Sequence, residues 1–137
     1  MIEKTPLCPQ RVRNITGSFA FIEHRFLRDG FLEILTHHEL VLYLFLVLAA
    51  DTKGLSYYSY DKICTLIRLS LDEYIYARDA LIQKDLIAFD GTLYQVLSLP
   101  QNPHPPRASP LKNPEDMAKH DPATIRQLIA KAIRRKS

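Results

Sequence analysis

The chain of 137 residues is long enough for one ordinary domain and a short appendage, and its hydrophobic content of 47% is sufficient for a packed core. This composition excludes a disordered chain. The formal net charge of +3 is unevenly divided, because residues 1–100 hold ten Lys or Arg against twelve Asp or Glu, net −2, and residues 101–137 hold eight against three, net +5. The positive excess lies in the tail, where any nucleic-acid contact is expected first.

The cysteines and the apolar runs bear on the compartment. Cys8 and Cys64 lie far apart without the spacing of metal ligands, and the chain does not open with a basic and apolar signal segment. We therefore expect a reducing, cytoplasmic compartment. The longest apolar run, Leu40 to Ala50, has 11 residues, whereas a helix that crosses a bilayer needs roughly 20. We expect no membrane span.

The amino-terminal part has little regular periodicity. Residues 1–17 contain two prolines and a glycine among scattered charges, and this predicts an irregular arm. The run Phe19–Ile22 predicts an edge strand. The segment Arg25–Leu35 predicts a short helix that is interrupted at Asp29-Gly30.

The next segment predicts a long helix. Thr36 to Glu39 has the form T-x-x-E, in which the threonine hydroxyl accepts from a backbone amide and the glutamate reaches back to the cap. The helix should begin at His37, run through Leu48 and stop near Gly54, which allows a left-handed exit. Because this helix is apolar all round, we expect it to be covered on every side.

Two shorter capped helices follow. A small strand is predicted from Leu55 to Tyr58, and Ser59 is a good cap for a helix that extends to Ile67. After a short turn, Ser70 to Glu73 has the form S-x-x-E and opens a helix that extends to Lys84. The short interval between these helices is typical of a helix-turn-helix.

A hairpin and a tail complete the chain. Leu86–Phe89 and Thr92–Leu97 predict two strands, joined by an Asp90-Gly91 pair of the kind that a two-residue type I′ turn favours. Residues 100–120 predict an extended linker, because six prolines lie between positions 100 and 114. Residues 121–137 predict a basic amphipathic helix with an aspartate cap and a proline in its first turn.

The spacing of these elements carries a resemblance to a known family. The matching patterns are Leu35-Thr36-x-x-Glu39 before the long apolar helix, Ser59-x-x-Lys62-Ile63, Ser70-Leu71-x-x-Tyr74, and Ala80-Leu81-x-x-Lys84-x-Leu86-Ile87. Over about residues 26–97 the chain resembles the winged helix-turn-helix domains of plasmid and phage replication initiators and related mobile-element proteins. One departure is Asp85, where such domains usually place a glycine, but aspartate tolerates the left-handed conformation better than most residues.

The resemblance implies an α+β, mainly α fold. Residues 18–99 would form the winged helix-turn-helix domain, and the hairpin would be its wing. Helix 71–84 would then be the recognition helix, which enters the major groove of DNA in such domains.

The charges on that helix argue against groove reading. At about 100° per residue, the outward positions are Asp72, Glu73, Tyr76, Asp79, Ala80, Gln83 and Lys84. They hold three acids and one base, and the hairpin tip, Phe89–Thr92, has no Lys or Arg. Because phosphates dominate DNA affinity, carboxylates at the leading end of the helix would repel the duplex. We interpret this face as a contact for a protein partner.

Arg78 falls on the inward face of the same helix. We expect its stem to be packed and its guanidinium to be paired with a carboxylate or to reach solvent, which is a structural role.

The nucleic-acid contact is assigned to the tail. Its basic candidates are Arg126, Lys131, Arg134, Arg135 and Lys136, which suit a salt-sensitive contact with DNA or RNA without sequence preference. The apolar stripe of the same helix suits docking on the domain or on a second copy. Together with the apolar helix that begins at His37, it leads us to expect a homodimer.

Catalysis and metal binding find little support. His37, His38 and Glu39 are adjacent, but neighbouring side chains on a helix point about 100° apart and cannot close on one ion. No Gly-rich phosphate loop or nucleophile elbow is present. We expect no cofactor, no metal and no enzymatic activity.

The resulting prediction is a non-enzymatic accessory protein in a DNA transaction, such as replication initiation or mobile-element control. The alternative is a sequence-specific transcriptional or replication regulator that reads the major groove through Tyr76, Gln83 and Lys84.

Overall fold

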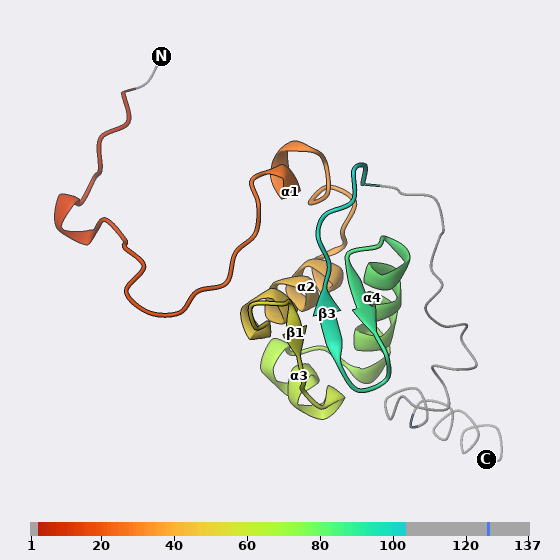
Figure 1. Ribbon diagram of the computed structural model, residues 1–137. Coiled ribbons are helices and arrows are strands. Elements are labelled where there is room, and N and C mark those ends of the chain that lie inside the picture. The colour runs from red at the N-terminus through yellow and green to blue at the C-terminus, as the bar shows by residue number, and fades with distance from the viewer. Residues whose placement is uncertain (1–2, 104–125, 127–137) are drawn as a thin grey trace.

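The computed structural model describes residues 3–103 and Arg126 (Figure 1). Four α-helices and a three-stranded antiparallel sheet make up this part of the chain, so the fold is mixed α+β and mainly helical. The predicted helix 121–137 lies outside the described residues except for Arg126, and the predicted linker 100–120 lies outside them beyond residue 103.

The elements follow one another with short connections. In chain order they are the 3-10 turn η1 (Pro9–Arg11), α1 (Arg25–Arg28), α2 (His37–Ala49), β1 (Leu55–Ser56), α3 (Tyr60–Ile67), α4 (Leu71–Gln83), β2 (Ile87–Phe89) and β3 (Tyr94–Val96). The sheet order is β1-β3-β2, so β3 lies in the middle, with Leu55 opposite Gln95 and Phe89 opposite Tyr94.

One hydrophobic core joins the helices to the sheet. α2 packs along α4 and contacts β1, β3 and α3, and Leu46 of α2 and Leu81 of α4 are fully buried. α1 is attached through its single buried residue, because the Phe26 ring stacks on Tyr43 of α2 at a centroid distance of 5.0 Å. Burial of this kind stabilises a fold by about 25 cal/mol for each Å² of apolar surface removed from water.

The predicted helix starts are confirmed. α2 begins at His37 and the Thr36 side chain accepts a hydrogen bond from the Glu39 amide, while α4 begins at Leu71 behind a full capping box of Ser70 and Glu73. Asp85 has a φ of 61°, so the position where a glycine was expected is indeed left-handed.

Gly54 is required where the chain turns into β1. Its φ is +85°, and a Cβ at this position would lie 2.5 Å from the carbonyl oxygen of Val96. This close approach lets the Val96 amide donate a 2.8 Å hydrogen bond to the Gly54 carbonyl.

Two strand predictions need correction. Phe19–Ile22 forms no strand, because no strand in residues 3–103 pairs with it, and Phe19 and Phe21 are 66% and 73% exposed. The strand predicted for Leu55–Tyr58 is limited to Leu55–Ser56.

The hairpin turn is displaced by one residue from its predicted position. The Asp90 amide donates to the Leu93 carbonyl, so the turn centres on Gly91 and Thr92 rather than on Asp90 and Gly91. The physical reason is the Asp90 carboxylate, whose Oδ1 accepts from the amides of Thr92 at 2.8 Å and Leu93 at 2.7 Å.

Within one copy of the chain, the described residues do not cover α2 on every side. Val41, Leu44 and Leu48 are 38%, 45% and 68% exposed. α4 and the sheet pack on the opposite face of α2, where Leu42 and Leu46 are fully buried. One apolar face of this helix is therefore open.

Candidate functional site

The inner face of α4 fixes the orientation of the helix. Tyr74 is fully buried, and its hydroxyl is hydrogen-bonded to the hydroxyl of Tyr94 on β3. Arg78 is 1% exposed, and its guanidinium carbon lies 5.5 Å from the Tyr74 ring centroid and 5.3 Å from that of Phe89. Its Nη2 also lies 3.1 Å from a carboxylate oxygen of Asp79. The structural role predicted for Arg78 is confirmed by this burial and pairing.

The outward side of α4 carries a narrow polar strip. We define the outer strip of α4 as Asp72, Tyr76, Asp79 and Gln83, which recur at helical spacing. Tyr76 is the most exposed of the large apolar residues on this helix, at 74%. The strip therefore combines two carboxylates, one phenol and one amide, and it contains no base.

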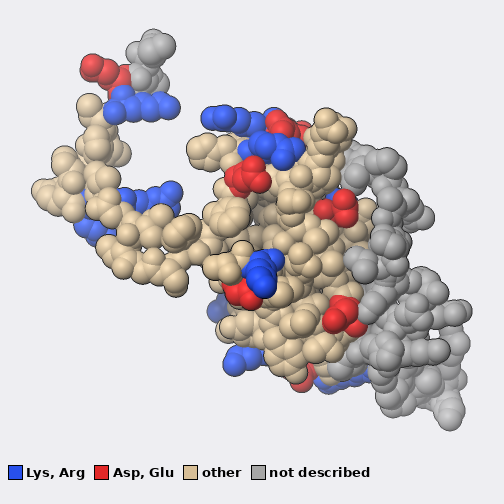
Figure 2. Space-filling model, viewed as in Figure 1, with Lys and Arg blue, Asp and Glu red and all other residues tan. Residues whose placement is uncertain are grey.

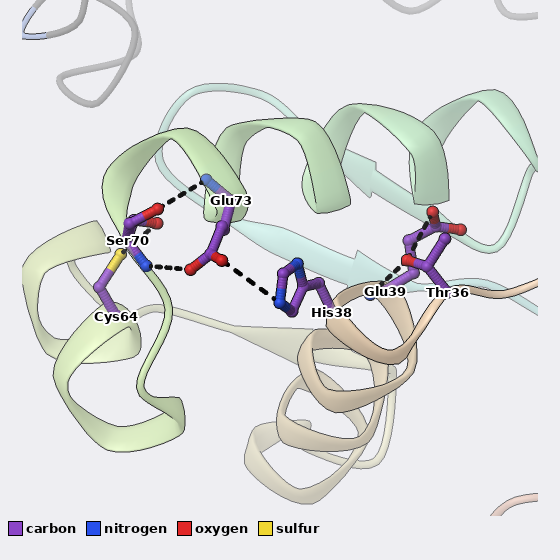
Figure 3. Close-up of polar contacts among 6 residues, drawn as sticks. All are labelled: Thr36, His38, Glu39, Cys64, Ser70 and Glu73. Atoms are coloured by element: carbon purple, nitrogen blue, oxygen red, sulfur yellow. Dashed lines mark hydrogen bonds and ion pairs between the residues drawn. The ribbon is translucent and has the colours of Figure 1, made fainter.

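The Glu73 side chain points toward Ser70 at the helix start and toward His38 (Figure 3). Its Oε1 accepts a 2.8 Å hydrogen bond from the Ser70 amide, and its own amide donates to Ser70 Oγ at 3.1 Å. Its other oxygen lies 3.4 Å from Nε2 of His38 on α2. The hydrogen bond from the Ser70 backbone lowers the pKa of Glu73 from its ordinary value. This carboxylate is engaged in capping, so it contributes less to the outer surface than the sequence indicated.

The placement of Lys84 on the outward face is wrong. Lys84 Nζ donates a 2.7 Å hydrogen bond to the carbonyl oxygen of Ile34 and a further one to the carboxylate of Glu39, which is 7% exposed. The helix is rolled relative to the prediction, because Tyr74 and Ala77 are buried and bring the Lys84 side of α4 against the start of α2. The one base predicted for this surface is therefore used inside the fold.

A sequence signal for this contact existed. Glu39 is the only acid in α2, whose residues from Leu40 onward are all apolar, and a buried carboxylate requires a cation or several donors. That signal indicates a partner for Glu39, but it does not identify Lys84, which lies 45 residues further along the chain.

The hairpin tip lacks basic side chains as well. Asp90, Thr92 and Leu93 are exposed there, and none of them is basic. Phe89 does not belong to the tip, contrary to the prediction, because it is 6% exposed and stacks on Tyr94 at 4.3 Å. The face shown in Figure 2 has acidic and basic side chains interspersed, and no continuous cationic band crosses its described part.

Arg126 is the one described member of the predicted nucleic-acid contact. Its Nη1 lies 3.6 Å from the Asp61 carboxylate and donates to the Tyr60 hydroxyl at 3.4 Å, both at the start of α3. The hydrogen bond with Tyr60 raises the pKa of Arg126 from its ordinary value. The Arg126 side chain is 65% exposed, so this ion pair contributes little to stability. Lys131, Arg134, Arg135 and Lys136 lie outside the described residues.

Other chemistry is sparse in this part of the chain. Within residues 3–103 and at Arg126, no three His, Cys, Asp or Glu side chains are grouped so that they would hold a metal ion. Burial raises the pKa of the Cys64 thiol, whose Sγ lies 3.9 Å from the Ser70 carbonyl oxygen (Figure 3). None of the described helices has the length and apolar character needed to span a membrane.

Comparison with protein families, with curated proteins and with solved structures finds no match to this chain. Functional inference therefore depends on the charges and exposure of the surface just described.

Proposed function

We propose that this chain is a winged helix-turn-helix accessory protein that acts in the cytoplasm in a DNA transaction, such as replication initiation or mobile-element control. The order α2, β1, α3, α4, β2, β3 and the sheet order β1-β3-β2 support this architecture. α3 and α4 would be the helix-turn-helix pair, and the β2-β3 hairpin would be the wing.

The observation that carries the functional proposal is the outer strip of α4, which has two carboxylates and no base. A recognition helix needs cationic or amide side chains toward DNA, because neutralised phosphates supply most of the binding free energy. With Lys84 bound to Glu39, this helix offers Gln83 as its only amide and no cation toward a duplex. The outer strip of α4 is therefore better suited to contact a protein than to contact a DNA duplex.

The chemistry of that protein partner follows from the strip. Tyr76, at 74% exposure, is the type of aromatic residue that anchors protein interfaces. Asp72 and Asp79 flank it, and the Asp79 carboxylate is shared with Arg78. We propose a partner with an apolar pocket for Tyr76 and basic side chains toward the acidic outer strip of α4.

Nucleic-acid binding is assigned to the basic carboxy-terminal segment, which includes Arg126, Lys131, Arg134, Arg135 and Lys136. The net charge of −2 over residues 1–100 and of +5 over residues 101–137 supports this division. Binding of this type depends on salt and shows little sequence preference.

The test measures duplex DNA affinity against salt for two matched fourfold variants of the full chain. The tail variant changes Lys131, Arg134, Arg135 and Lys136 to Gln, and the body variant changes the exposed Arg28, Lys53, Lys62 and Arg68 to Gln. Each lost phosphate contact reduces the slope of log K against log salt by about 0.9. We expect the slope of the tail variant to be smaller by about 3.6 and the slope of the body variant to match that of the unmodified protein.

The alternative, a sequence-specific regulator that reads the groove with α4, predicts the reverse. In that case the body variant loses affinity, and Gln83→Ala together with Tyr76→Ala abolishes the preference for one DNA sequence. The first result would contradict the assignment of DNA binding to the carboxy-terminal segment, and the second would contradict the assignment of α4 to a protein partner.

A further inference from the structure

The open face of α2 is an apolar surface in contact with solvent. We define the α2 strip as Val41, Leu44 and Leu48, which recur at i, i+3 and i+7 and are 38%, 45% and 68% exposed. No charged residue occurs from Leu40 to Ala50, so the strip is not interrupted by charge along the helix. A contiguous exposed apolar surface of this kind usually marks an interaction site.

The amino-terminal arm, residues 3–24, is a second exposed apolar segment. Every residue from 3 to 19 is exposed, and Phe19 and Phe21 are exposed to 66% and 73%. Figure 1 shows the arm leaving α1 and running away from the body of the domain. The hydrogen bonds of its described residues 3–22 are local, from the Arg11 amide to the Cys8 carbonyl and from Cys8 Sγ to Gln10.

We propose that the arm of one copy of this chain packs on the α2 strip of a second copy, and that the exchange is reciprocal, giving a two-fold dimer. In an extended segment, Phe19 and Phe21 point to the same side and lie about 7 Å apart. Leu44 and Leu48 lie about 6 Å apart along the helix axis. The spacing of the two rings therefore matches the spacing of the two leucines.

Charge also favours this occupant. The arm, residues 3–24, contains three Lys or Arg against two Asp or Glu, net +1, whereas residues 25–103 contain seven Lys or Arg against ten Asp or Glu, net −3. The carboxyl end of α2 adds the negative end of a helix dipole and Asp51 beside the α2 strip. The arm and residues 25–103 thus carry net charges of opposite sign, which favours their association.

The size of the arm fits a stable dimer. It has 22 residues, and a protein interface of ordinary size uses roughly 20–30 residues on each side. Ala20 packs against the core of its own domain, whereas Phe19 and Phe21 on either side of it are exposed and open to contact from a neighbouring molecule. In a reciprocal exchange each arm covers the α2 strip of the other copy, so both arms and both strips are buried.

The experiment measures the molar mass of the full chain by light scattering or sedimentation over a concentration series. The arm variant is Phe19→Ser with Phe21→Ser, and the strip variant is Leu44→Glu with Leu48→Glu. Each should raise the dimer dissociation constant at least about tenfold. The control variant, Leu27→Glu with Leu66→Glu, changes two other exposed leucines, on α1 and α3, and should remain dimeric.

Mixing distinguishes exchange from other arrangements. An equimolar mixture of the arm variant and the strip variant retains one intact arm on one intact strip, so we expect a heterodimer although each variant alone is monomeric. Thermal unfolding followed by circular dichroism checks that each variant is folded. We expect folded variants, because substitutions of exposed side chains change stability little.

Three results would overturn the proposal: a monomeric unmodified protein at concentrations of hundreds of micromolar, a dimer that the arm variant leaves intact, or a mixture that stays monomeric. The first result excludes a dimer, and the second indicates pairing of strip with strip. These measurements use neither nucleic acid nor a partner protein, so the inference stands or fails separately from the proposed function.

Discussion

α2 and α4 begin with the same motif and use it differently. Each helix has 13 residues, each follows a hydroxyl cap, and each has a glutamate at its third position. In α4, Glu73 and Ser70 exchange both hydrogen bonds of the capping box at the surface. In α2, the Thr36 hydroxyl donates to Glu39, and the Glu39 carboxylate also accepts from Lys84 of the neighbouring helix.

The difference shows what a local motif determines. Both motifs set the first residue of a helix, because a cap satisfies backbone amides whatever surrounds it. The second partner of the glutamate depends on packing, since Glu39 is 7% exposed and Glu73 remains accessible to solvent. The two helices also differ at their centres, where α2 buries Leu46 and α4 buries Arg78.

The largest expected effect comes from replacing this buried arginine. Arg78→Ala removes the side chain that lies between Tyr74 and Phe89 and leaves a cavity there. It also removes the cation that pairs with the Asp79 carboxylate. We expect a loss of about 3 kcal/mol in the free energy of unfolding, measured by urea titration.

Two controls define the cause of that loss. Leu46→Ala on α2 should cost a similar amount, about 3 kcal/mol, because a large buried side chain is removed in both cases. Arg78→Met keeps most of the volume without the charge and should retain most of the stability. An Arg78→Ala protein within about 1 kcal/mol of the unmodified protein would contradict a packed role for Arg78.

The second expected effect tests the contact between the two helices. Lys84→Met leaves the Glu39 carboxylate buried with one cation fewer, and we expect a loss of about 2 kcal/mol in the free energy of unfolding. Adding Glu39→Gln to Lys84→Met should reduce that loss, because the double variant has no buried carboxylate without a cation. A double-mutant cycle measures the coupling, which should be at least about 1 kcal/mol. Additive effects would show that the two side chains do not interact.

Lys84 also marks the limit of prediction from sequence. The starts of α2 and α4, the left-handed Asp85 and the presence of a hairpin depend on local signals, and the structure confirms them. The direction of Lys84 depends on how far α4 is rolled against α2, which is set by contacts between distant segments. A helical count alone places this side chain on the wrong face.

The strand predicted at Phe19–Ile22 fails for a related reason. Its aromatic and apolar composition fits a strand, but a strand requires a neighbour that supplies hydrogen bonds. The three strands of the described part pair only with one another, in the order β1-β3-β2. The sequence pattern therefore predicts a strand at Phe19–Ile22, but no neighbouring strand in the described part pairs with it.

The third expected effect concerns the capping box of α4. Ser70→Ala should lower the free energy of unfolding by about 1 kcal/mol, because the Glu73 amide loses its acceptor. The matched change at the start of α2, Thr36→Ala, removes the acceptor of the Glu39 amide, while Glu39 keeps Lys84.

The same box predicts a dependence on pH. The folded state lowers the pKa of Glu73 below its ordinary value of 4.5, so the charged carboxylate stabilises the fold above that value. This contribution is lost as the pH falls through the lowered pKa. The stability difference between the unmodified protein and Glu73→Gln should therefore shrink on acidification, as measured by urea titration at several pH values. A difference that grows on acidification would show that the pKa is raised instead.

The smallest expected effect on stability separates two tyrosines that lie two residues apart on α4. Tyr76 is 74% exposed, and Tyr76→Ala should change the free energy of unfolding by no more than about 0.5 kcal/mol. Tyr74 is fully buried, and Tyr74→Phe removes its hydrogen bond to Tyr94, so a loss of about 1 kcal/mol is expected. Urea titration measures both. A loss at Tyr76 as large as that at Tyr74 would mean that this ring supports the fold, and the argument that it is available to a protein partner would fail.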